Sequence, residues 1–207
     1  MADAAGATNQ RAIHPLFIRV THWANAFAIF IMVLSGWRIY NASPLFGFEF
    51  PPNFTLGGWL AGALAWHFAG MWLLALNGMA YLGYGVVSGH FGRRLLPISL
   101  KRALDDVMFA IQGRLVHAPG RYNAAQRLFY IGVILAVIVA IVSGLAIWKP
   151  VQLQGLTALM GGYEGARRVH FFAMAAIVAF LVVHIGLAVT VKGILAPMFN
   201  GRAEASR

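Results

Sequence analysis

The chain has 207 residues, of which 60% are hydrophobic and only 11% are charged, and its mean hydropathy is +0.71. A soluble domain of this length would carry about a quarter charged residues, so the composition excludes an ordinary soluble protein. The net charge of +10 would suit a nucleic-acid surface, but the basic residues flank long apolar segments and we expect no nucleic-acid partner. The absence of cysteine excludes disulfides and any redox group that cysteine would have to hold.

Four stretches without acidic or basic residues are long enough to cross a bilayer core, which takes about 20 residues. They predict transmembrane helices near 20–38, 57–86, 128–148 and 169–191. Pro51 and Pro52 should keep the first part of the second stretch outside its helix. We therefore expect an all-α membrane protein with one domain over 1–207, a four-helix transmembrane bundle.

The connections between these helices differ in character. The first, 41–56, is rich in Pro and Phe, as suits a membrane interface. The second, 87–127, has apolar residues at helical spacing and predicts an amphipathic helix near 98–116, lying in the interface or packed on the helix ends. The third, 149–168, contains Gly155, Gly161 and Gly162 and is expected to be a flexible loop against a partner protein. No internal sequence repeat is convincing.

Basic residues are distributed unequally between the two sides of the predicted bundle. Twelve fall on the side of the termini and the 87–127 loop, whereas the other side receives four: Arg38, Lys149, Arg167 and Arg168. Cytoplasmic segments carry such an excess of Lys and Arg. We expect a multi-pass protein of the bacterial cytoplasmic (inner) membrane, with both termini and the long loop in the cytoplasm. No cleavable signal peptide is evident, so the first helix should act as its own insertion signal.

Four histidines lie within the apolar segments: His22, His67, His170 and His184. Ionisable residues are costly in hydrocarbon, which makes each of them a functional-site hypothesis. His170 and His184 are fourteen residues apart. At 100° and 1.5 Å per residue they share one helix face and lie about 21 Å apart along the axis.

Depth in the membrane pairs these histidines. His22 should lie near the cytoplasmic side with His184, and His67 should lie further out with His170. Each pair could bind one haem iron from both sides, and an iron ligated in this way has no open position, which suits electron transfer. A hydrogen-bonded structural histidine is the alternative for any one of them. The third helix has no histidine and is expected only to line the bundle.

Gly36 follows His22 by fourteen residues and should lie on the same face at the depth of the outer pair. A missing side chain there would let a porphyrin edge approach the backbone. Gly70, Gly83 and Gly186 could act in the same way. Ordinary small-residue packing between membrane helices is the alternative for each of them.

Several motifs resemble one known family. They are R-V-T-H-W-A-N-A around His22, W-H-F-A-G-M-W around His67, G-R-Y-N-A-A-Q-R-L-F-Y before the third helix, and R-R-V-H-F-F-A-M and V-V-H-I-G-L-A around His170 and His184. Together they resemble the di-haem cytochrome b subunits of Ni/Fe hydrogenases, formate dehydrogenases and thiosulfate-reductase-type enzymes, over about 11–195. The resemblance implies that the four histidines ligate two b haems, paired as depth suggests.

The resemblance also implies electron transfer between a membrane quinone, ubiquinone or menaquinone, and a periplasmic catalytic subunit such as a molybdenum enzyme or a hydrogenase. Five polar residues near the inner haem are candidates to bind the quinone or relay its protons: His14, Arg19, Tyr122, Asn123 and Arg127. They could equally contact haem propionates or membrane lipid. Arg38, Arg167 and Arg168 could neutralise propionates of the outer haem.

Three other functions remain open. A stand-alone quinone-linked oxidoreductase would use a small donor or acceptor, such as superoxide or a ferric chelate, and would act without a catalytic subunit. A haem-free, histidine-lined transporter would call for carboxylates within the spans, and the predicted spans contain neither Asp nor Glu. A purely structural anchor leaves the paired histidines unexplained.

Overall fold

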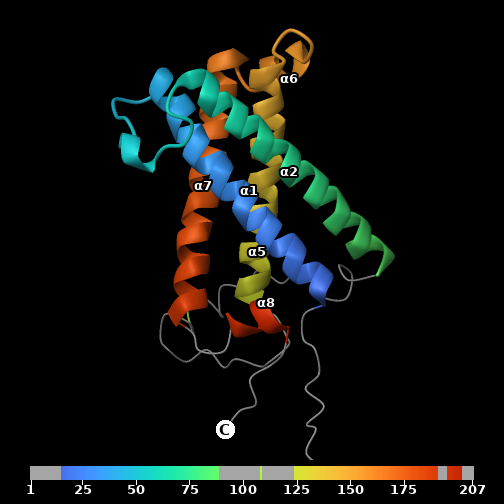
Figure 1. The fold of residues 1–207 in the computed structure, drawn as a ribbon. Coiled ribbons are helices and arrows are strands. Elements are labelled where there is room, and N and C mark those ends of the chain that lie inside the picture. Colours follow the sequence, from blue (N-terminus) through green and yellow to red (C-terminus); the bar gives the residue numbers. More distant parts are fainter. Residues whose placement is uncertain (1–14, 89–107, 109–123, 191–194, 202–207) are drawn as a thin grey trace, which may run out of the picture.

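The computed structural model describes residues 15–88, 108, 124–190 and 195–201, and 124–127 by their backbone alone. Its long helices are α1 (Leu16–Ala42), α2 (Leu60–Val87), α5 (Ala124–Trp148) and α7 (Gly162–Thr190). Each of these contains a segment long and apolar enough to cross a membrane, and the described residues form no strand. The predicted all-α, four-helix transmembrane architecture is therefore confirmed (Figure 1).

Short helices mark the two ends of the bundle. At one end, called here the α6 end, lie η1 (Pro52–Phe54) and α6 (Gln154–Leu159), and at the other, the α8 end, lies α8 (Ala196–Asn200) (Figure 1). Helices α1 and α5 run toward the α6 end, and α2 and α7 run back from it.

The helices pack as two hairpins. Close backbone packing joins α1 to α2 and α5 to α7, whereas the backbones of the two hairpins approach each other at few points among the described residues. The buried side chains are mostly small, including Ala28, Ala63, Ala146 and Ala166. Many large apolar side chains, such as Phe27 and Leu135, instead face outward, where a bilayer would surround them.

Two features hold α1 against α2. Gly70 lies so close to α1 that a Cβ there would come within 2.8 Å of Met32 Cγ and 3.3 Å of the Ala28 carbonyl oxygen. Gly70 therefore serves helix packing, the alternative given for it, rather than clearing space for a porphyrin edge. The Asn77 side chain donates to the Thr21 carbonyl at 2.7 Å and to Asn25 Oδ1 at 2.6 Å. Small residues and interhelical hydrogen bonds are what hold helices together where no hydrophobic driving force exists.

Aromatic side chains join the hairpins at the α6 end. Tyr40 of α1 contacts Phe171 of α7 with ring centroids 5.4 Å apart, and Phe68 of α2 contacts Trp148 of α5 at 5.1 Å. Phe50, in the loop after α1, stacks on Trp37 at 4.6 Å. The aromatic loop predicted at 41–56 thus folds back onto the helix ends.

The connection between α5 and α7 is more ordered than the flexible loop expected over 149–168. It contains α6, and Gly161 and Gly162, with φ of 85° and 83°, form the tight turn into α7. Left-handed backbone of this kind favours glycine. The amphipathic helix expected near 98–116 lies outside the described residues, apart from Met108.

Candidate functional site: two histidine pairs between the hairpins

The first histidine pair lies toward the α6 end of the bundle. His67 of α2 faces His170 of α7, with ring centroids 6.3 Å apart and ring planes 69° apart. One ring comes from each hairpin, so the pair spans the space between them. The partners inferred from depth are thus the residues that the fold brings together.

The second pair lies toward the α8 end. His22 of α1 faces His184 of α7, with ring centroids 6.1 Å apart and ring planes 58° apart. Phe180 stacks on the His184 ring at 5.4 Å, with only 12° between the planes. Because α7 carries one member of each pair, fourteen residues of helix separate the two levels, or about 21 Å.

The separation between the rings suits a metal ion between them. Two imidazole–metal bonds of about 2 Å, with about 1 Å from each bonding nitrogen to its ring centre, would place the ring centres about 6 Å apart. Both observed separations, 6.3 Å and 6.1 Å, match this value. No described group of three or more His, Cys, Asp or Glu residues could hold a metal. Each pair could therefore supply two imidazole nitrogens to the metal of a cofactor such as haem, which would bring its remaining ligands itself.

Hydrogen bonds fix the tautomer of His67. Its Nδ1 lies 3.1 Å from the Met32 carbonyl oxygen and 3.1 Å from Ser35 Oγ, both on α1. A carbonyl oxygen can only accept, so Nδ1 carries the proton and donates. The lone pair therefore sits on Nε2, the nitrogen available to a metal.

His170 has the same arrangement, supplied by α5. Its Nδ1 donates to the Ala140 carbonyl oxygen at 2.9 Å and lies 3.1 Å from Ser143 Oγ. The prediction that the third membrane helix only lines the bundle is therefore wrong, because α5 orients a site histidine. A search for ligand side chains alone misses this role, since a backbone carbonyl has no residue signature.

A glycine follows each of these serines and lies against the same imidazole. A Cβ on Gly36 would stand 3.5 Å from His67 Cε1, and one on Gly144 would stand 3.3 Å from His170 Cε1. Gly36 thus lies at the level of the first pair, as its position predicted. Among the described residues, and apart from the backbone of its own helix, no heavy atom lies within 4 Å of a Cβ built on Gly83 or Gly186.

These matching contacts reveal a structural repeat, although no sequence repeat was convincing. Ser35 and Gly36 of α1 correspond to Ser143 and Gly144 of α5, which lie 108 positions later in the sequence (35 and 143). Tyr40 corresponds to Trp148 at the same offset. On α2 and α7, His67 matches His170 at an offset of 103 positions (67 and 170).

The second offset also carries Phe68 to Phe171, so the two aromatic contacts that join the hairpins are counterparts as well. The repeat ends at the second pair, because the same offsets place Tyr130 opposite His22 and Tyr81 opposite His184. The repeated Ser-Gly and His-Phe dipeptides are the sequence signals that could have found it.

Arg19 lies one helical turn from His22 at the α8 end. Its guanidinium donates to the Phe199 carbonyl of α8, and its buried Nε has no hydrogen-bond partner among the described residues. Trp23 Nε1 donates to the Met198 carbonyl at 3.2 Å. Together with Leu16 and Val20, these residues line an open pocket of about 300 Å³. Of the other quinone candidates, His14, Tyr122 and Asn123 lie outside the described residues, and Arg127 is described only as helix backbone.

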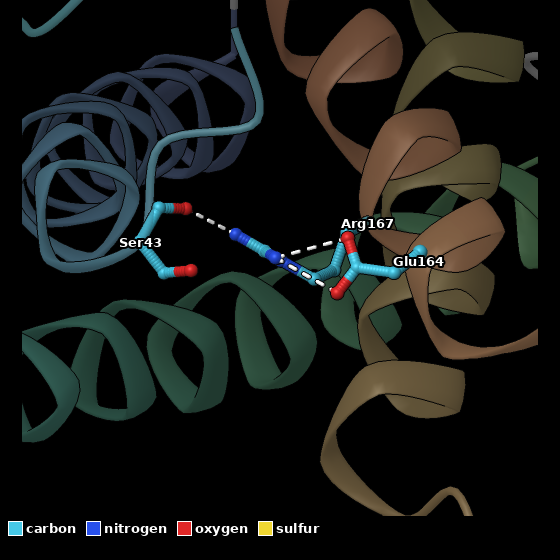
Figure 2. A network of polar contacts seen from close by, with 3 residues as sticks. All are labelled: Ser43, Glu164 and Arg167. Carbon is cyan, nitrogen blue, oxygen red and sulfur yellow. Dashed lines mark hydrogen bonds and ion pairs between the residues drawn. The ribbon is translucent and has the colours of Figure 1, made fainter.

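The three arginines predicted near the outer haem occupy different settings at the α6 end. Arg167 pairs with Glu164 at 3.0 Å and donates to the Ser43 carbonyl, which ties α7 to the end of α1 (Figure 2). Arg38 is half-buried and Arg168 is exposed. Arg167 therefore already has acceptors, which leaves Arg38 and Arg168 as the arginines more readily available to an anionic group.

Four apolar helices with a histidine pair at each of two levels define the class of membrane b-type cytochromes. The family model described as prokaryotic cytochrome b561 matches residues 13–201, and the chain belongs to this family. Membership implies a haem b protein that transfers electrons in a prokaryotic membrane, as a subunit of an oxidoreductase system.

Curated relatives cover nearly the whole chain. A protein of Azospira oryzae, assigned by name as a protein-methionine-sulfoxide reductase subunit, YedZ1, is 50% identical over 92% of this chain and 96% of its own length. The Ni/Fe-hydrogenase B-type cytochrome subunit assigned in Bradyrhizobium diazoefficiens is 26% identical over 98% of this chain and 92% of its own. The formate dehydrogenase cytochrome b556(fdo) subunit of Escherichia coli K12 is 26% identical over 88% of this chain and 81% of its own length.

Proposed function

We propose that the chain is a single cytochrome b domain that holds two b haems. His67 and His170 would hold one, and His22 and His184 would hold the other. The observation that carries this proposal is that the two histidines of each pair face each other across the space between the hairpins. Their ring centroids are 6.3 Å apart in the first pair and 6.1 Å apart in the second. Bound there, the haem irons would supply one-electron oxidation and reduction without an open coordination position.

The residues around the pairs have defined tasks in this proposal. Met32 and Ala140 accept the Nδ1 protons of His67 and His170, so both imidazoles present Nε2 inward. Outward-facing apolar side chains keep the site within lipid and away from bulk water. The common helix α7 holds both levels at a fixed separation along the membrane normal.

We further propose that the α8 end is the cytoplasmic end and takes electrons from a quinol, whereas the α6 end passes them to a periplasmic partner. The excess of basic residues around the termini and the 87–127 loop supports this orientation. The position of Arg19 supports a quinone site at this end, because its cationic side chain borders an apolar pocket one turn from His22. A guanidinium there can donate to a quinone carbonyl, and protons must accompany electrons at that step.

We propose that the partner is an oxidoreductase that reduces methionine sulfoxide in proteins. The name of the Azospira oryzae relative, which is 50% identical to this chain, supports this proposal. Each sulfoxide takes two electrons and two protons and releases methionine and water, so electrons would run from the α8 end to the α6 end. The hydrogenase and formate dehydrogenase relatives are subunits of enzymes of other chemistries, so co-purification with the intact complex decides the partner.

A quinol-reduction experiment on two variants tests the path. We expect purified His184→Ala to lose the haem at the α8 end, keep the other, and no longer be reduced rapidly by a soluble quinol. His170→Ala should lose the haem at the α6 end and still be reduced. Retention of both haems in either variant would contradict the ligand assignment, and equal quinol reduction of both variants would contradict the position of the quinone site. Full activity of the isolated chain with superoxide or a ferric chelate would favour the stand-alone oxidoreductase.

A further inference from the structure

We propose that Ser35 and Ser143 are positioning residues that set the redox potential of the haem held by His67 and His170, and of that haem alone. The proposal rests on the proposed function, because it assigns a role to residues one shell beyond the proposed ligands. The observation behind the proposal is a repeated arrangement. In each hairpin, a serine on the first long helix contacts Nδ1 of a histidine on the second.

Both serines are fully buried and make the same hydrogen bonds. Ser35 Oγ donates to the Ile31 carbonyl at 2.6 Å, and Ser143 Oγ donates to the Val139 carbonyl at 2.6 Å. A serine hydroxyl has one proton, which these bonds use. Toward the histidine each Oγ can therefore act only as an acceptor.

Each imidazole Nδ1–H thus faces two acceptors, a backbone carbonyl and a serine oxygen. For His67 both acceptors lie at 3.1 Å, and for His170 they lie at 2.9 Å and 3.1 Å. Acceptors at the outer nitrogen of a ligating histidine raise the basicity of the inner nitrogen. A more basic ligand stabilises the ferric state, so the two serines should lower the potential of this haem.

The register of the repeat does not carry these serines and histidines over to the second pair. The residues that match His22 and His184 are Tyr130 and Tyr81, so this level is not built from two equivalent halves. The two haems should therefore differ in potential. The serine contribution should also be nearly equal from both sides of the first level, since its geometry is repeated there.

Redox titration of serine variants tests this proposal. Ser35→Ala and Ser143→Ala should each raise the midpoint potential of the same haem, the one that His170→Ala removes. At fixed potential the expected change in its ratio of oxidised to reduced forms is up to about tenfold, equivalent to 59 mV for one electron. The double variant should shift it further, and the other haem should titrate unchanged.

Two matched controls separate this role from general destabilisation. Thr21 is buried on α1 and, like Ser35, its hydroxyl bonds to the carbonyl four residues before it, at 2.9 Å. Thr21→Val should leave the potential of the α6-end haem unchanged. Gly144→Ala, whose Cβ would stand 3.3 Å from His170 Cε1, should turn that imidazole and alter the low-spin ferric electron paramagnetic resonance signal. Gly83→Ala should leave that signal unchanged, because its Cβ would have no neighbour within 4 Å from another part of the described structure.

The outcomes distinguish this inference from the proposed function. If both haems are present and neither serine variant moves a potential or a resonance signal, the positioning role is refuted and the ligand assignment stands. If both haems shift equally, the effect is not confined to one level and the inference is again refuted. A wild-type chain that folds without haem would instead overturn the proposed function.

Discussion

At the scale of single residues, a polar side chain within a membrane segment needs hydrogen-bond partners from the protein. Asn77 illustrates this at the α1–α2 interface, because its amide donates to Asn25 Oδ1 at 2.6 Å and to the Thr21 carbonyl at 2.7 Å. An unpaired amide would be costly in hydrocarbon, so both partners are supplied by the facing helix.

Replacement of Asn77 should weaken the first hairpin. Since interhelical hydrogen bonds in membranes contribute about 0.6 kcal/mol on average and up to about 1.7 kcal/mol, we expect Asn77→Leu to lower the free energy of unfolding within that range. Unfolding in mixed detergent micelles, followed by helical circular dichroism, measures it. As the control, Asn25→Ala and the double variant complete a thermodynamic cycle, and purely additive losses would show that the two amides do not interact.

Residue identity predicted some of this site and left other parts hidden. The four histidines stood out because ionisable groups are rare in apolar segments, and helix geometry then indicated which of them share a level. The carbonyls of Met32 and Ala140 could not be predicted, since every residue carries a carbonyl and only the packing of neighbouring helices selects one.

At the scale of helices, close packing within each hairpin contrasts with the sparse backbone contact between hairpins. Gly70 sets the approach of α2 to α1, where a Cβ would meet Met32 Cγ at 2.8 Å and Ile31 Cγ2 at 3.1 Å. The same two helices carry His67 and His22, one in each histidine pair, so the spacing of this hairpin influences both levels.

Gly70→Ala should therefore overpack the first hairpin. We expect a loss of about 1–3 kcal/mol in the free energy of unfolding, as for other insertions into tight cores. Detergent unfolding and haem content together measure it. Gly83→Ala on the same helix is the matched control, since its Cβ would meet no described atom of another helix within 4 Å and alanine favours helix over glycine. Equal stability of the two variants would contradict this view of the interface.

Charge-free segments predicted the four long helices well, because the thickness of the hydrocarbon core sets how many consecutive apolar residues a membrane-crossing helix needs. The segment 149–168 is more ordered than the flexible loop predicted for it. Its glycines indicated flexibility, but Gly161 and Gly162 instead form the turn between α6 and α7, and Arg167 fixes the start of α7 to Ser43 (Figure 2).

At the scale of the whole molecule, orientation in the membrane decides which histidine pair meets quinone. The absence of cysteine makes single-cysteine labelling clean. Leu159 in α6 is 83% exposed. Leu159→Cys should react with a membrane-impermeant maleimide in intact spheroplasts, whereas Ala5→Cys in the amino-terminal segment should react only after permeabilisation. The reverse pattern would place the α6 end in the cytoplasm and invert the proposed direction of electron flow.

The proposed electron path requires two b haems in this chain, one between each facing histidine pair. A reduced-minus-oxidised absorption spectrum, combined with haem quantitation on the purified full chain, tests it most directly. We predict two low-spin b haems per chain. A correctly folded chain with no haem, or with only one, would contradict the account.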